Sequence, residues 1–236
     1  MLVQSVDEIV AVNAPLILPD TCILLDILRS PRRENIDAQS IRSAQAILEA
    51  IKPSGTIASV IAGQVSDELN DNKAGVLKDT GDSLRKLQTE LHRINGWSQI
   101  LGVAGHADMT HGLNAVASCD AILTEWVDSS FLVGTTDELT GFAHRRMMQR
   151  ITPAKLGKDS FKDCLVVETY LKLAKDIRAR GHSATIVFAS SNTAEFIERP
   201  SSQLYGDIAS EFTALGIEYA RALHEAAYQL KLPVTS

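Results

Sequence analysis

Short apolar runs alternate with helix-patterned segments along this chain, and this alternation limits the possible folds most strongly. The apolar runs lie at 15–18, 56–61, 184–189 and 216–220. Strands that are separated by helices pair in parallel, because a parallel connection needs a crossover about as long as a helix. We therefore expect an α/β fold, a three-layer α/β/α sandwich around a parallel sheet, in a single domain over 1–236.

The segment 73–152 carries a different pattern. Leucine and isoleucine recur at helical spacing between Leu77 and Leu101, and no run in the segment has a clear strand pattern. We expect an all-helical insertion that either restricts access to a site or binds a partner. Its long apolar stripe is a core stripe, a helix-hairpin seam or the seam of a homo-oligomer.

Composition excludes several classes of protein. Apolar residues make up 45% of the chain and charged residues 22%, which is enough for a folded core. The net charge of -6 argues against binding nucleic acid through bulk positive charge. The 3 cysteines form no CxxC pair, which favours a reducing compartment. The N-terminus has no basic n-region, and no apolar run approaches the ~20 residues of a membrane span, so we expect a cytoplasmic protein.

Four acids stand near the ends of the expected elements. Asp20 follows one strand and Glu68 lies just beyond another, Asp163 opens a helix, and Glu195 follows a third strand. The carboxyl ends of parallel strands share one edge of a sheet, where ligands bind. Carboxylates gathered there suit Mg²⁺ or Mn²⁺. Taken singly, each has a plain alternative, such as a helix cap for Asp20, a favourable helix-dipole position for Asp163 or a solvated helix residue for Glu68.

Four segments resemble, in this order, the PIN-like domain family, most closely its larger bacterial branch. These segments read LPDTCILLDIL, SDELNDN, GKDSFKDCLVVETYLKL and IVFASSNTAEF. The resemblance covers roughly 15–72 and 153–220. It implies Mg²⁺- or Mn²⁺-dependent cleavage of RNA, and in some members of DNA.

The resemblance also assigns residues. Asp20, Glu68 and Asp163 match the first three acids of the family's site. Asn192 stands where the family usually carries Asp, and Glu195 fills the next acidic position. An amide carbonyl can bind a cation but adds no charge, so the number of ions, one or two, stays open.

A basic stretch lies next to Asp163. Between Gly141 and Lys158 there is no acid, whereas basic residues accumulate at Arg145, Arg146, Arg150, Lys155 and Lys158. We expect a rim that contacts phosphates, with a solvated helix face as the alternative. A shorter cluster near Asp20 comprises Arg29, Arg32 and Arg33. Ser191 is either a hydrogen-bonding neighbour of the metal ligands or a turn residue.

The resulting hypothesis is a metal-dependent endoribonuclease in which Asp20, Glu68 and Asp163 hold the ions and Asn192 and Glu195 complete their shell. Lys158, Arg145, Arg146 and Ser191 would contact substrate. One alternative is a catalytically silent module that binds RNA or a protein, which Asn192 favours. The others are a toxin restrained by an antitoxin and a phosphohydrolase acting on small phosphorylated substrates.

Overall fold

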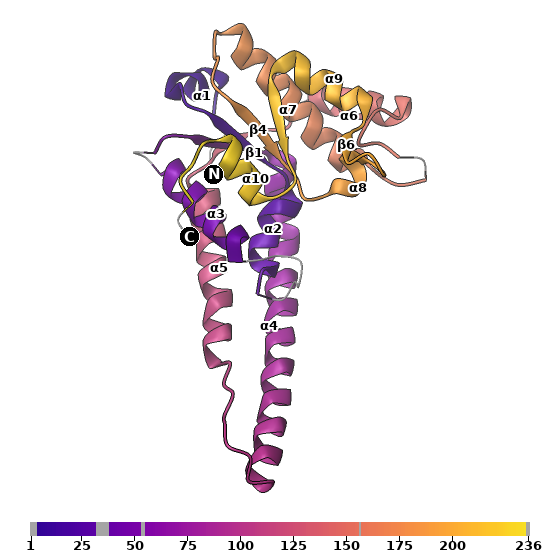
Figure 1. The fold of residues 1–236 in the computed structure, drawn as a ribbon. Helices are drawn as coiled ribbons and strands as arrows, with labels where there is room; N and C mark the ends of the chain where they lie inside the picture. Colours follow the sequence, from indigo (N-terminus) through magenta and orange to yellow (C-terminus); the bar gives the residue numbers. More distant parts are fainter. Residues whose placement is uncertain (1–3, 32–37, 53–54, 156, 235–236) are drawn as a thin grey trace.

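The computed structural model describes residues 4–31, 38–52, 55–155 and 157–234. Its centre is a five-stranded parallel sheet (Figure 1). The strands are β1 (Leu16–Pro19), β2 (Ala58–Ala62), β3 (Phe131–Val133), β4 (Ile186–Ala189) and β7 (Ile217–Ala220). They lie in the order β3-β2-β1-β4-β7, which confirms the predicted α/β fold with a parallel sheet.

Strand order reverses at the centre of the sheet. From β1 the chain adds β2 and then β3 on one side, and it crosses back to place β4 and β7 on the other side. β1 pairs with both of its neighbours, since Leu16 lies opposite Ala58 of β2 and Ile186 of β4. In open α/β sheets ligands bind at the carboxyl ends of the strands where the order reverses. Here that position lies between β1 and β4.

Helices cover both faces of the sheet (Figure 1). One face carries α1 (Val6–Val12), α6 (Asp137–Gln149), α7 (Phe161–Ala179) and α9 (Gly206–Leu215). The other face carries α2 (Thr21–Arg29), α3 (Ala38–Ile51), α5 (Thr110–Asp128) and α10 (Leu223–Gln229). The short helix α8 (Thr193–Phe196) follows β4 and leads into an antiparallel pair, β5 (Ile197–Glu198) and β6 (Gln203–Leu204).

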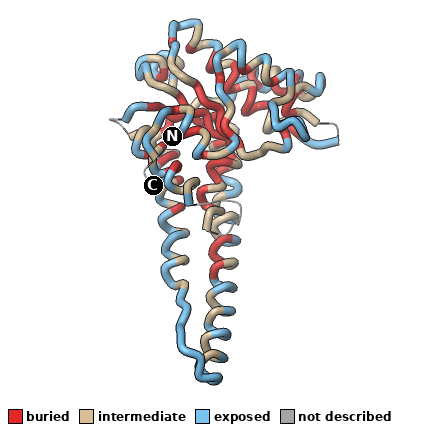
Figure 2. Tube along the Cα trace, viewed as in Figure 1, coloured by how far each residue is buried: buried red, intermediate tan, exposed pale blue. Residues whose placement is uncertain are grey.

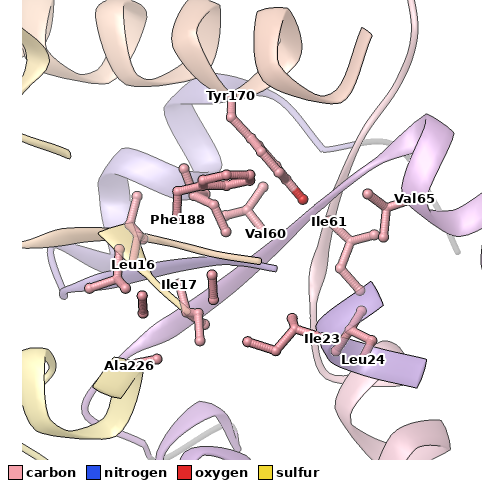
Figure 3. Close-up of a cluster of buried hydrophobic side chains, with 14 of the residues drawn as sticks. Leu16, Ile17, Ile23, Leu24, Val60, Ile61, Val65, Tyr170, Phe188 and Ala226 are labelled. Carbon is pink, nitrogen blue, oxygen red and sulfur yellow. The ribbon is translucent and has the colours of Figure 1, made fainter. Parts of the chain in front are cut away.

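The core explains why the strands read as continuous apolar runs. Every residue of β1, β2 and β4 is buried, because helices pack on both faces of the sheet. Figure 3 shows Tyr170 of α7 and Phe188 of β4 on one side of the strands, with Ile23 of α2 and Ala226 of α10 on the other.

The expectation that 73–152 is all helical is wrong, because β3 lies within it. Phe131 pairs in parallel with Val60 of β2 and extends the sheet by one edge strand. A run of three apolar residues is too short to show strand alternation, so β3 could not be predicted from the residue pattern. The C-terminal half of α5 also packs into the body, where the buried Trp126 donates its Nε1–H to Ser59 Oγ at 3.0 Å.

Helix α4 (Gly63–Ile100) begins at the end of β2 and runs beyond the body alongside α5 (Figures 1 and 2). Its buried residues end at Leu84, and farther along Ile94, Trp97 and Leu101 are exposed. The predicted apolar stripe is therefore a helix-hairpin seam near the body and solvent-facing beyond it. Among the described helices, none combines the length and the apolar character that crossing a bilayer needs.

Candidate functional site

Asp20 stands at the carboxyl end of β1, beside the reversal of strand order. Its backbone is extended and its Oδ1 accepts the Thr21 N–H at 2.7 Å, so it caps the N-terminus of α2. Its Oδ2 accepts the Ser190 hydroxyl at 2.7 Å and the Cys22 thiol at 3.1 Å. The side chain is 9% exposed. The carboxylate is thus held in one orientation at the sheet edge.

Glu68 and Asp163 bring two further carboxylates to Asp20. Glu68 lies early in α4, where Gln64 Nε2–H donates to its Oε1 at 2.9 Å. Asp163 is half-buried in the first turn of α7. Burial raises the pKa of Asp20, and the charge of Glu68 raises it further. Burial and the charges of Asp20 and Glu68 together raise the pKa of Asp163 to about 6, against the opposing charge of Lys158.

The three predicted acids therefore lie within electrostatic range of one another, although they come from separate parts of the chain. Each lies close enough for its charge to act on a neighbour. Like charges at such a site are stabilised when a proton or a cation joins them.

Tyr170 ties the two strand ends beneath this site together. Its hydroxyl donates to Pro19 O at 2.7 Å and accepts the Ala62 N–H at 3.1 Å. In Figure 3 its hydroxyl reaches across the sheet toward β2. Burial raises the pKa of Tyr170, so the group stays neutral and keeps its proton for Pro19. Tyr170 thereby fixes the end of β1, which carries Asp20, against the end of β2, which leads into α4.

The serine that contacts Asp20 is Ser190 and not the neighbouring Ser191 that was predicted. Ser190 is fully buried, and besides donating to Asp20 its Oγ accepts the Asn192 N–H at 3.3 Å. Its carbonyl accepts the Tyr219 hydroxyl at 2.9 Å. The strand register identifies this residue. Pro19 of β1 lies opposite Ala189 of β4, so the residues that follow them, Asp20 and Ser190, are neighbours at the sheet edge.

Asn192 and Glu195 follow β4 but differ in their surroundings. Asn192 immediately precedes α8, and its side chain makes no capping hydrogen bond. Glu195 is 2% exposed, and its Oε1 forms an ion pair with the Lys158 ammonium. Its Oε2 is buried without a hydrogen-bond partner in the described part of the chain. Two residues predicted for different roles, Glu195 for metal and Lys158 for substrate, are thus paired with each other.

Arg146 does not belong to an exposed phosphate-binding rim, which corrects the prediction. It is 3% exposed, and its guanidinium donates to Glu168, Glu211 and the Thr152 carbonyl, each at 2.6 Å. The reason is its position on α6, whose buried face consists of Leu139, Ala143 and Arg146. That spacing places Arg146 on the inward helical face, so it joins α6 to α7 and α9.

The other basic residues are distributed over the surface. Arg145 is exposed, and its guanidinium lies 5.7 Å from the centre of the Phe142 ring. Lys155 donates to the Ala194 carbonyl. Arg29 forms an ion pair with Asp26 at 3.2 Å, while Arg32 and Arg33 lie outside the described residues.

The donors of the site fit a divalent cation chemically. Carboxylate oxygens are hard ligands of the kind that Mg²⁺ and Mn²⁺ prefer. As the side chains stand, no group of three or more His, Cys, Asp or Glu residues in the described ranges is placed to hold an ion. Joint binding therefore requires rotation of a carboxylate, and no hydrogen bond from the described residues restrains Asp163.

The candidate site is defined by the positions of Asp20, Glu68 and Asp163. Asp20 is fixed by three donors, and Glu68 and Asp163 approach it from two helices.

No protein-family model, curated protein or solved structure matches the chain.

Proposed function

We propose that this protein is a metal-dependent nuclease, an endoribonuclease that hydrolyses phosphodiester bonds with Mg²⁺ or Mn²⁺ at Asp20, Glu68 and Asp163. One observation carries the proposal. Asp20 stands at the carboxyl edge of the sheet where strand order reverses, and Glu68 and Asp163, from separate segments, lie within electrostatic range of it. Ligand sites of open α/β sheets occupy this position.

Each protein group has a part in this proposal. A bound divalent ion would make a water more acidic and neutralise charge on the phosphate. Hydrogen bonds from the Ser190 hydroxyl and the Thr21 N–H hold the Asp20 carboxylate in one orientation. Asp163 is free to turn toward an ion, and Lys158 and Arg145 offer exposed positive charge for the substrate backbone.

The resemblance to PIN-like domains favours the same assignment. The segments on which it rests supply Asp20, Glu68, Asp163 and the loop that follows β4. RNA is the substrate class that the resemblance favours, with DNA as the second class to be tested.

A silent binding module is the second candidate, and Asn192 favours it. Asn192 provides a neutral amide where the family usually has a carboxylate, which lowers the negative charge available for a second ion. Such a module would bind Mn²⁺ and RNA without cutting the strand.

A cleavage assay tests the proposal. Labelled single-stranded RNA and, separately, DNA are incubated with the protein in Mg²⁺, Mn²⁺ or EDTA. Asp20→Asn and Asp163→Asn are the test variants, since asparagine at position 20 can still cap α2. Asp67→Asn, an exposed change next to Glu68, is the control.

We expect metal-dependent cutting by the wild type and the control, and none by the two test variants. Full activity in both test variants would overturn the proposed mechanism. Metal binding by a folded wild type that cuts neither nucleic acid would favour the silent module.

A further inference from the structure

The ion pair between Lys158 and Glu195 joins the loop before α7 to α8, beside the three carboxylates. Glu195 is 2% exposed, and its Oε1 contacts the Lys158 ammonium, whose side chain is 53% exposed. The same ammonium acts electrostatically on Asp163. The partly exposed Lys158 ammonium therefore pairs with Glu195 and lies within electrostatic range of Asp163.

Glu195 is incompletely satisfied by this partner. Its Oε2 is buried without a hydrogen-bond partner among the described residues, although buried carboxylate oxygens nearly always have one. A divalent cation would contact a carboxylate more strongly than a single ammonium does, because it carries twice the charge. Lys158 thus supplies the cation that Glu195 contacts, and its charge also favours the ionised form of Asp163.

We propose that the Lys158 ammonium takes the place of a second divalent cation between Asp163 and Glu195. This inference rests on the proposed function for the first ion, at Asp20, Glu68 and Asp163. The folded chain binds that first ion tightly and a second ion weakly, because the second must displace Lys158 from Glu195. A phosphate oxygen of the substrate competes for the same ammonium, so substrate binding favours entry of the second ion.

The alternative is an ordinary structural ion pair that fastens the loop to α8. The two accounts differ in what happens when the lysine charge is removed. A structural pair predicts lower stability and no change in metal stoichiometry. If Lys158 takes the place of an ion, removing its charge should create a second metal site, since Glu195 would be left as a buried carboxylate without a cation.

Mn²⁺ titration by calorimetry, with bound ions counted by electron paramagnetic resonance, distinguishes these accounts. The variants are Lys158→Gln, which removes the charge, and Lys158→Arg, which keeps it. Lys155→Gln is the matched control, because Lys155 contacts the Ala194 carbonyl rather than a carboxylate. The double variant Lys158→Gln/Glu195→Gln removes both partners.

We expect Lys158→Gln to bind the second ion at least about tenfold more tightly than the wild type. Lys158→Arg, Lys155→Gln and the double variant should show one tight ion, as the wild type does. Unchanged second-site affinity in Lys158→Gln overturns the inference. If Lys158→Gln does not fold, Glu195→Gln is titrated at high Mn²⁺ in its place. A weak second site that persists in Glu195→Gln, as in the wild type, would also overturn the inference.

Failure of the proposed function has a different outcome in the same titration. If the first ion binds equally well to Asp20→Asn and the wild type, the primary site is wrong. If the first ion behaves as proposed and Lys158→Gln gains nothing, only the role of Lys158 is wrong.

Discussion

The Asp163→Asn substitution should make the metal-free protein more stable while removing its proposed activity. Asp163 is half-buried, and both Asp20 and Glu68 disfavour its charge. Asparagine has nearly the same shape and no charge. A residue retained for binding a cation would thus destabilise the fold when no cation is present.

The size of this effect follows from the pKa of Asp163. The rise from 3.8 to about 6 corresponds to about 3 kcal/mol for the charged form. Solvent screening of this half-buried group lowers the expected gain to about 1–2 kcal/mol. For a chain of this length such a gain raises the melting temperature by roughly 2–8 °C.

The gain should depend on pH in one direction. Between pH 3.8 and about 6 the folded protein keeps a proton on Asp163 that the unfolded chain has lost. Wild-type stability therefore falls as pH rises through this window. The advantage of Asp163→Asn is full above about pH 6 and shrinks as the pH falls toward 3.8.

Thermal unfolding in EDTA at several pH values measures this difference, with Asp67→Asn as the exposed control. Adding Mn²⁺ should stabilise the wild type more than Asp163→Asn, because a ligand that binds the folded state raises stability. If metal-free Asp163→Asn is less stable than the metal-free wild type at pH 7.5, the reasoning about the three carboxylates is refuted.

Three other substitutions test the support of the site. Tyr170→Phe leaves a buried carbonyl and a buried N–H without partners, so urea unfolding should show a loss of about 2–4 kcal/mol. Ser190→Ala removes a donor to Asp20 and should weaken Mn²⁺ binding by about tenfold in a calorimetric titration, with little change in fold. Arg146→Met leaves two carboxylates without their buried cation and should cost about 3–5 kcal/mol, whereas Arg145→Met should change stability by less than about 0.5 kcal/mol.

Much of the sheet could be predicted because its strands are buried on both faces. The run 184–189 is apolar apart from Thr185, and the observed β4 lies inside that range. The edge strand β3 was missed because three residues show no periodicity, and the prediction of an all-helical segment failed with it.

Prediction of the site was uneven for a different reason. Secondary-structure elements determine where their ends lie in the fold. Acids at such ends, for example Asp20 and Asp163, could therefore be predicted to be neighbours from the sequence. Individual side-chain partners depend on register and on helix face. Register distinguishes Ser190 from Ser191, and helix face buries Arg146 while leaving Arg145 in solvent.

Anomalous diffraction from crystals soaked in Mn²⁺ tests the central claim most directly. The account predicts a manganese peak within ligand distance, about 2–2.5 Å, of oxygens from Asp20, Glu68 and Asp163. The peak should disappear in crystals of Asp163→Asn. Manganese bound elsewhere, or no peak between these three carboxylates at saturating Mn²⁺, would contradict it.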